Sequence, residues 1–79
     1  MPVIETILQE LERITATDEV RKDLDLDLYA EGILDSLGTV ELMVAFDESF
    51  GLSLTPAQLD RQQWSTPRKI IAYIEERVM

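Results

Sequence analysis

The hydrophobic pattern of the chain predicts a helix near each end. Apolar residues recur with i, i+3, i+4, i+7 spacing at Ile4, Ile7, Leu8, Leu11 and Ile14. This spacing predicts an amphipathic helix over about residues 3–15, whose solvent-facing side carries Glu5, Glu10, Glu12 and Arg13. The same period returns at Ile70, Ile71, Ile74 and Val78. Because Thr66 is a good N-cap and Pro67 suits a first helical position, we expect the last helix to span about residues 67–78.

A third helix is predicted over about residues 36–50, and it carries two apolar stripes. Gly51 is placed to end this helix as a left-handed residue. At 100° per residue, one face collects the residues expected in the core, which are Thr39, Leu42, Met43, Phe46 and Phe50. A second, narrower stripe lies roughly 140° away and consists of Leu37, Val40 and Val44, with Ser36 at one end. Three acidic residues flank this second stripe: Glu41, Asp47 and Glu48.

The second stripe has two interpretations. It could pack beneath a neighbouring loop, which would make it an extension of the core of a small bundle. Alternatively, it is an exposed apolar strip with an acidic rim that adjoins Ser36. A strip of that kind is typical of a docking surface for partner proteins, because an apolar centre and a polar rim are the usual anatomy of such interfaces.

The connecting segments complete the predicted fold. The pair Thr55–Pro56 is typical of an N-cap followed by a first helical position, and predicts a short helix or turn through about Leu59. Residues 23–28 alternate as a strand does, but no partner strand is evident, and a lone strand is not stable. We therefore expect residues 17–35 to form a long ordered loop, pinned by Val20, by some of its leucines and by Tyr29. The predicted fold is all-α: one domain over residues 1–79, a small bundle of three main helices plus one short helix, with a long first loop.

Composition narrows the function. A formal net charge of −9 in 79 residues argues against nucleic-acid binding. The acidity either favours brief, salt-sensitive encounters with basic partner proteins or only keeps the protein soluble. No apolar run approaches the roughly 20 residues that span a membrane, and the first residues lack the basic region of a signal peptide. We therefore expect a cytoplasmic monomer that is not itself inserted in a membrane.

Ser36 is the candidate for chemistry, yet the chain contains no histidine and no cysteine that would activate it or form a thiolate. Asp23, Asp25 and Asp27 lack the glycine and the glutamate that would complete a calcium loop, so we expect no metal site. One interpretation makes Ser36 a helix cap only, since either Asp35 or Ser36 can be the N-cap. The other makes its hydroxyl a tether, because a phosphate ester there would meet the positive end of the helix dipole. In that case Gly38 removes side-chain bulk one turn into the helix.

Two motifs resemble known carrier proteins. The run Leu34-Asp35-Ser36-Leu37, followed by Thr39-Val40-Glu41-Leu42, resembles the phosphopantetheine attachment site of the acyl and peptidyl carrier protein family. In that family 4'-phosphopantetheine is esterified to the serine that follows the aspartate, which implies Ser36 as the attachment residue and Asp35 as its neighbour in the site. The extended run from Glu31 through Gly38 to Leu42, together with Asp60-Arg61-x-x-Trp64-x-Thr66-Pro67, is similar to the D-alanyl carriers of Gram-positive bacteria. Fatty-acid carriers usually have an acidic residue in place of Gly38.

The resemblance implies that the protein acts with three partner enzymes, one after another. A phosphopantetheinyl transferase would modify Ser36, and a D-alanine–carrier protein ligase would load D-alanine as a thioester. A membrane-bound O-acyltransferase would then receive it for D-alanylation of teichoic or lipoteichoic acid, so the carrier would visit the inner face of the membrane and catalyse nothing itself. Partner contacts would come from Leu37, Val40, Glu41, Val44, Asp47 and Glu48. The alternatives are an acyl or aminoacyl carrier of another pathway, and an unmodified helical adaptor.

Trp64 also has two interpretations. It could fill the core between the last two helices, which we favour because large aromatic side chains are usually well buried. It could instead contact a partner near the attachment site.

Overall fold

The computed structural model describes residues 3–55 and 60–78, and within these ranges every regular element is helical. The elements are α1 (Val3–Thr15), α2 (Glu19–Lys22), α3 (Ser36–Phe50), the 3₁₀ helix η2 (Arg61–Trp64) and α4 (Pro67–Val78). The predicted all-α bundle of three main helices is confirmed, with the expected bounds. Gly51 ends α3 in the left-handed region at φ 68°, and its N–H donates to the carbonyl of Asp47 at 2.8 Å.

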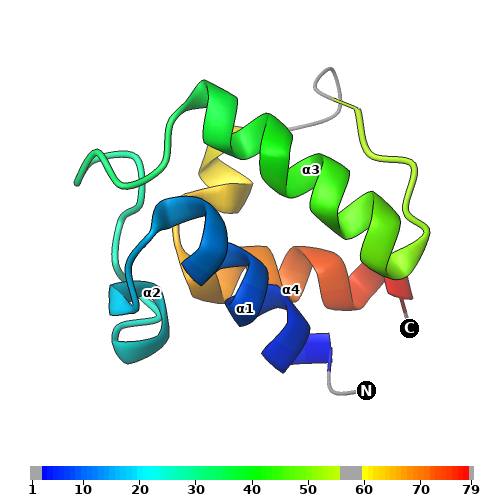
Figure 1. The fold of residues 1–79 in the computed structure, drawn as a ribbon, viewed down its shortest axis with the longest axis horizontal. Coiled ribbons are helices and arrows are strands. Elements are labelled where there is room, and N and C mark those ends of the chain that lie inside the picture. Colours follow the sequence, from blue (N-terminus) through cyan, green and yellow to red (C-terminus); the bar gives the residue numbers. More distant parts are fainter. Residues whose placement is uncertain (1–2, 56–59, 79) are drawn as a thin grey trace.

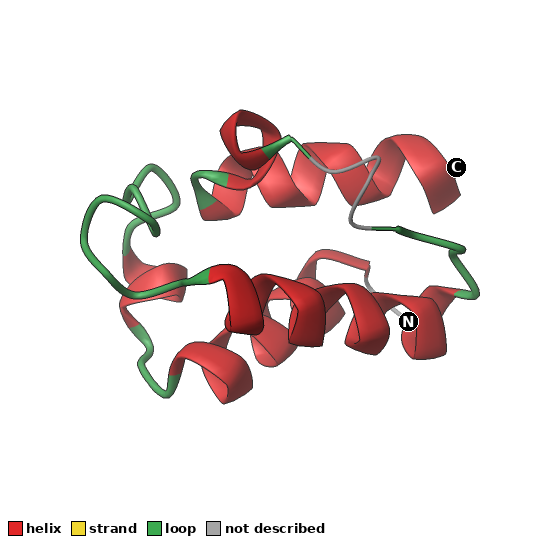
Figure 2. Cartoon of the chain, turned by 90° about the horizontal axis from the view of Figure 1, so that it is seen from above, coloured by secondary structure: helices red, strands yellow, loops and turns green. Residues whose placement is uncertain are grey.

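The three long helices form the body of the molecule. In Figure 1, α3 crosses above α1 and α4, and the start of α1 and the end of α4 lie at the same end of the bundle. Figure 2 shows the same bundle from above, with the loop between α2 and α3 at the opposite end, where α3 begins. The long loop therefore lies beside Ser36, the first residue of α3.

The core is built from the apolar faces that the periodicity predicts, with Trp64 added from η2. The predicted core face of α3 is confirmed, since Leu42 and Phe46 are fully buried and Thr39 and Met43 nearly so. The Trp64 ring lies 5.7 Å from that of Phe46 and 5.6 Å from that of Tyr73, centroid to centroid, in edge-on geometry. Since none of the Trp64 side chain is accessible, the core interpretation is confirmed and the partner-contact interpretation is wrong.

The long first loop is ordered, as predicted, because it is anchored to the far end of the chain. The backbone N–H of Leu28 donates to the carbonyl of Ser65 at 2.7 Å, and the N–H of Arg68 donates to the carbonyl of Leu24 at 2.9 Å. Val20 and Leu28 are completely buried. The residues expected to pin the loop therefore do so.

One feature of this segment was not predicted. Residues Glu19–Lys22 form the short helix α2, which is too short for a helical period to be recognised in the sequence. Arg21 joins it to α1 by donating to Glu12 and, at 2.8 Å, to Oε2 of Glu5. This hydrogen bond and the charge of Arg21 lower the pKa of Glu5.

The short helix or turn predicted after Thr55–Pro56 falls on residues 56–59, which lie outside the described part of the chain. A short helix that was not predicted, η2, precedes α4. The described helix, η2, begins after Asp60, whose Oδ1 accepts from the N–H of Gln62 at 2.9 Å. This side-chain cap is the local signal that could have located η2 in the sequence.

Candidate functional site

Asp35, not Ser36, caps the N-terminus of α3. Oδ1 of Asp35 accepts a hydrogen bond from the backbone N–H of Gly38 at 2.7 Å. The capping requirement is thus satisfied by the neighbouring residue, and Ser36 becomes the first residue of the helix. The interpretation of Ser36 as a cap only is therefore wrong. The Ser36 side chain is exposed at the N-terminal end of α3.

Gly38 has a packing role that the sequence did not indicate. A Cβ atom at this position would lie 2.9 Å from Cδ1 of Leu34 and 3.3 Å from Oδ1 of Asp35. Leu34 is buried, and Asp35 makes the cap. The glycine therefore makes room for the residues that hold the start of α3.

A short chain of hydroxyl groups connects the long loop to the first turn of α3. Oγ1 of Thr39 lies 2.8 Å from the carbonyl oxygen of Asp35, to which it donates, and 2.7 Å from the hydroxyl oxygen of Tyr29. Because the threonine hydroxyl has one proton and uses it on the carbonyl, Tyr29 must be the donor to Thr39. Tyr29 is thereby held beside the first turn of α3.

Arg61 approaches Ser36 from η2, although the two residues are 25 positions apart in the sequence. Its Nη2 donates to Oγ of Ser36 at 2.8 Å. Its guanidinium carbon lies 4.6 Å from the centroid of the Tyr29 ring, within the range of a cation–π interaction. The contact between Arg61 and Ser36 was not predicted, and the only local signal for Arg61 is its place in the Asp60–Trp64 motif.

The surroundings of Ser36 fit a phosphate ester. Within the described part of the chain, no group accepts a hydrogen bond from the backbone N–H of Ser36 or Leu37. These N–H groups form the positive end of the α3 dipole, which favours an anion. Together with the guanidinium of Arg61, they create a positive environment at a hydroxyl that is exposed to solvent.

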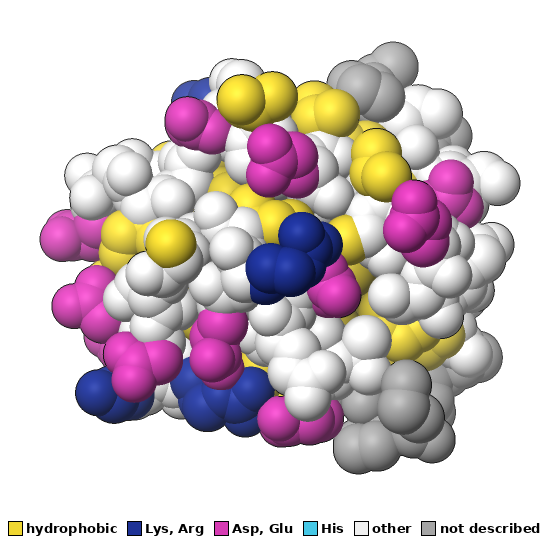
Figure 3. Space-filling view, in the orientation of Figure 1, with side chains coloured by type: hydrophobic (Ala, Val, Ile, Leu, Met, Phe, Trp, Pro, Cys, Tyr) yellow, Lys and Arg dark blue, Asp and Glu magenta, His cyan; other side chains and the backbone are white. Residues whose placement is uncertain are grey.

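The second stripe of α3 is exposed, so the interpretation in which it packs beneath the long loop is wrong and the interpretation as an exposed apolar strip is confirmed. The accessible fractions are 68% for Leu37, 43% for Val40 and 53% for Val44. The predicted acidic neighbours are also exposed, namely Glu41, Asp47 and Glu48. Figure 3 shows hydrophobic and acidic side chains interspersed over the upper part of this face, where α3 runs.

The exposed stripe borders a groove that α1 completes. Val40, Glu41, Val44 and Glu48 line it from α3, and Arg13 lines it from α1, around a volume of about 300 Å³. The pKa of Arg13 is raised, mainly by its hydrogen bond with Glu10 and further by the nearby charges of Glu10, Glu41 and Glu48. Arg13 was predicted on the solvent-facing side of α1, but its position at this groove was not predicted.

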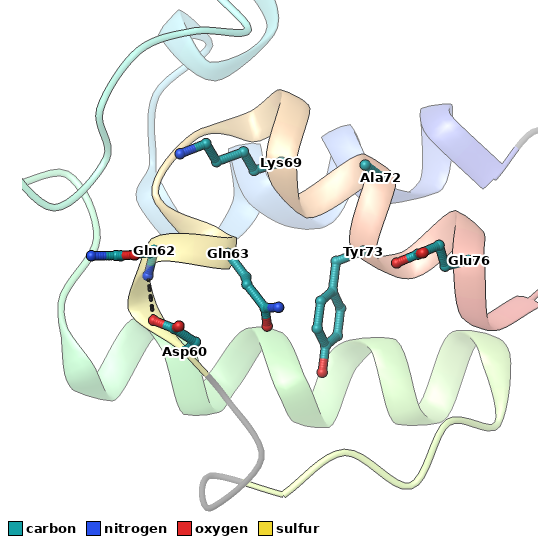
Figure 4. A pocket seen from close by; sticks show the side chains of 7 residues that line it. All are labelled: Asp60, Gln62, Gln63, Lys69, Ala72, Tyr73 and Glu76. Carbon is teal, nitrogen blue, oxygen red and sulfur yellow. Dashed lines mark hydrogen bonds between the residues drawn. The ribbon is translucent and has the colours of Figure 1, made fainter.

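Two open grooves flank η2. The one in Figure 4, about 500 Å³, lies between η2 and α4, with Asp60, Gln62 and Tyr73 among its lining residues, and none of the predicted site residues line it. The other, about 460 Å³, is lined in part by Tyr29, Arg61 and Lys69. The second groove therefore opens beside the Arg61 side chain that contacts Ser36.

Residues 3–55 and 60–78 lack two other features, a metal-binding cluster and a membrane-spanning helix. No group of three or more histidine, cysteine or acidic side chains there is arranged to hold a metal ion. No helix in these ranges is long and apolar enough to cross a membrane. Asp25, one of the aspartates considered for calcium, instead accepts from Nε of Arg68 at 2.8 Å, and this bond lowers its pKa.

The chain is similar to known proteins over nearly its whole length. The family model described as "Phosphopantetheine attachment site" matches residues 3–74. The D-alanyl carrier protein of Lactococcus lactis subsp. cremoris (strain MG1363) is 45% identical over 73 residues, which cover 92% of each chain. That of Enterococcus faecalis (strain ATCC 700802 / V583) is 44% identical over 75 residues, which cover 95% of this chain and 96% of the relative. The resemblance noted in the sequence is confirmed: the chain belongs to the phosphopantetheine attachment family and, within it, groups with the D-alanyl carrier proteins.

Proposed function

We propose that this protein carries D-alanine as a thioester on a 4'-phosphopantetheine arm attached to Ser36. The observation that supports it most strongly is the placement of Ser36. Its hydroxyl is exposed at the first position of α3 and does not cap the helix. The chain contains no histidine and no cysteine. The D-alanyl carrier relatives, similar over nearly the whole chain, support D-alanine as the cargo.

Modification of Ser36 needs a base from another protein. Within the described residues, the hydroxyl of Ser36 has Arg61 as its hydrogen-bond partner, and a guanidinium cannot accept a proton. A phosphopantetheinyl transferase with coenzyme A would therefore remove the proton. The bond from Oγ of Ser36 to phosphorus forms, the pyrophosphate link of coenzyme A breaks, and adenosine bisphosphate leaves. The arm supplies the thiol that this cysteine-free chain lacks.

The carrier itself contributes no catalytic group in this proposal. A D-alanine–carrier protein ligase would load the arm at the expense of ATP, and a membrane-bound O-acyltransferase would take the D-alanyl group for transfer to teichoic or lipoteichoic acid. The protein would act as a cytoplasmic monomer that visits the inner face of the membrane. Its roles are to present the tether and to be recognised in turn by each partner.

The exposed stripe of α3, formed by Leu37, Val40 and Val44, is the surface we assign to that recognition. It adjoins Ser36, so a partner docked on it would have its active site near the arm. Its acidic rim of Glu41, Asp47 and Glu48 suits partners with basic surfaces and speeds their encounter. Successive partners would compete for one face.

Loading experiments test the proposed cargo. The protein is first modified with coenzyme A and a phosphopantetheinyl transferase, and then incubated with the ligase, ATP and one acid from a panel of D- and L-amino acids and fatty acids. We expect intact mass to show one D-alanyl group added, at a rate at least about tenfold above that for L-alanine, as a differential of 1.4 kcal/mol gives. Equal loading of other acids would contradict D-alanine as the cargo while leaving a carrier function in place.

Substitutions in the stripe test the docking surface. We expect Val40→Asp or Val44→Asp to reduce loading by the ligase about tenfold or more, as a change at the centre of an interface does, while leaving the melting temperature nearly unchanged. Ile4→Asp is the matched control, because Ile4 is 44% accessible but lies on α1, in the first turn rather than on the stripe. A large loss of helicity in Val44→Asp, or an equal loss of loading in Ile4→Asp, would show that the stripe is not a docking surface.

A further inference from the structure

Arg61 differs from most other basic residues of this acidic chain in what it contacts. Of the seven lysines and arginines, five form ion pairs with carboxylates: Arg13, Arg21, Lys22, Arg68 and Arg77. Within the described residues, Arg61 pairs with no carboxylate, even though acidic residues outnumber basic ones 16 to 7. Its contacts are the hydroxyl of Ser36 and the ring of Tyr29. Its charge is thus available to an anion at Ser36.

The position of Arg61 is fixed from two sides. The guanidinium stacks over Tyr29, and Tyr29 is in turn held by its hydrogen bond to Thr39 in the first turn of α3. Arg61 itself belongs to η2, whose last residue is the fully buried Trp64. The Arg61 side chain therefore extends to Ser36 from a backbone segment that is anchored in the core. This anchoring lowers the entropy cost of keeping the guanidinium beside Ser36.

We infer that Arg61 binds the phosphate that would link Ser36 to its arm, and so draws the start of the arm toward η2. This inference rests on the proposed function, since it requires a phosphate ester at Ser36. The phosphorus would be bonded to the same oxygen that Nη2 of Arg61 contacts at 2.8 Å, which brings the non-bridging oxygens within reach of the guanidinium. The guanidinium, which donates to a neutral hydroxyl in this structure, would then donate to anionic phosphate oxygens, and its planar geometry fits phosphate well.

The surroundings of Arg61 indicate where the arm would begin. The groove beside it, about 460 Å³, is also lined by Lys69, the other basic residue without a carboxylate partner in the described part of the chain. The α3 stripe lies outside this groove, because none of its three residues lines it. Arg61 would thus hold the phosphate of the arm on the η2 side, and the α3 stripe would remain free for partners. Arg61 is a positioning residue in this inference, with no part in bond making.

Nuclear magnetic resonance of the modified protein tests the inference directly. Wild type, Arg61→Gln, Arg61→Lys and the control Lys22→Gln are each modified with coenzyme A and a transferase, and intact mass verifies the attachment. In ¹⁵N-labelled wild type, we expect modification to shift the Arg61 guanidinium resonance more than that of any other arginine. In Arg61→Gln, the ³¹P resonance of the ester should move toward its position in the urea-unfolded modified protein.

The controls separate this inference from the proposed function. Lys22→Gln removes the same charge from an exposed residue paired with Asp18 and should leave the ³¹P resonance as in wild type. Arg61→Lys should give an intermediate position, and about 1 M salt, with a Debye length of roughly 3 Å, should reduce the wild-type shift. Attachment by mass with an unshifted Arg61 resonance and a wild-type ³¹P signal in Arg61→Gln would overturn the inference. Absence of the mass gain in wild type would overturn the proposed function itself.

Discussion

Replacement of Ser36 by alanine should abolish the gain of phosphopantetheine completely. The hydroxyl oxygen of Ser36 becomes the ester oxygen in the proposed modification, so without it no bond to phosphorus can form at this position. Folding should be almost unaffected, because Asp35 supplies the cap of α3 and Ser36 makes only an exposed hydrogen bond with Arg61. A bond of this kind contributes about 1 kcal/mol or less to the free energy of unfolding.

The measurement is intact mass after incubation with coenzyme A and a promiscuous phosphopantetheinyl transferase. Ser53→Ala is the matched control, since Ser53 is also exposed but lies in the loop after α3, and it should be modified as fully as wild type. Circular dichroism verifies that both variants keep their helices. If Ser36→Ala gains the arm as wild type does, Ser36 is not the attachment residue; if wild type gains nothing, the adaptor interpretation stands instead.

Trp64→Ala should be among the most destabilising single substitutions in this protein, with a loss of about 3–5 kcal/mol in the free energy of unfolding. The Trp64 side chain is fully buried between Phe46 and Tyr73, so truncation leaves a cavity that the edge-on rings cannot fill without moving. The loss is large against the roughly 5–15 kcal/mol by which native domains are stable. Urea denaturation followed by circular dichroism measures it, because Trp64 is the only tryptophan and fluorescence is lost with it.

Trp64→Phe should lower the free energy of unfolding by only about 1–2 kcal/mol. Comparison of the two variants separates the loss of ring packing from the loss of any hydrogen bond made by Nε1. No atom in the described residues accepts a hydrogen bond from Nε1 of Trp64, so phenylalanine keeps an aromatic ring in place while removing a buried donor that is unsatisfied. Gln63→Ala, an exposed neighbour in η2, should change stability by less than about 0.5 kcal/mol. Equal losses for the alanine and phenylalanine variants would show that Nε1 makes an important hydrogen bond.

Much of the fold is readable from the sequence because its signals are local. The period of the apolar residues fixed the three long helices, and the caps at Thr66 and Gly51 fixed ends of two of them. In the structure, the backbone N–H of Lys69 donates to Oγ1 of Thr66 at 3.1 Å, as expected for the predicted N-cap. The elements that were missed, α2 and η2, have four residues each, and one helical turn gives no period to detect.

Ser36 was also recognisable in the sequence as the candidate attachment residue, whereas its environment was not predictable. Ser36 stands out because the chain has no histidine or cysteine and because the residues around it match a known motif. The competition between Asp35 and Ser36 for the capping role depends on side-chain rotamers that a sequence does not show. The exposure of Val40 and Val44 depends on whether the long loop covers α3, and that loop instead bonds to Ser65 and Arg68 at the far end of the chain.

By itself, then, the sequence determined the three long helices and the core face of α3, and it singled out Ser36 as the candidate tether residue, since periodicity, capping and motif all act over a few neighbouring positions. Only the tertiary structure decided that Trp64 is core, that the stripe of α3 is open to solvent, and that Arg61 reaches Ser36. These three outcomes depend on how η2 and the loop pack against α3. Contacts between residues 25 positions apart carry no local signature, because they exist only once the chain between them has folded.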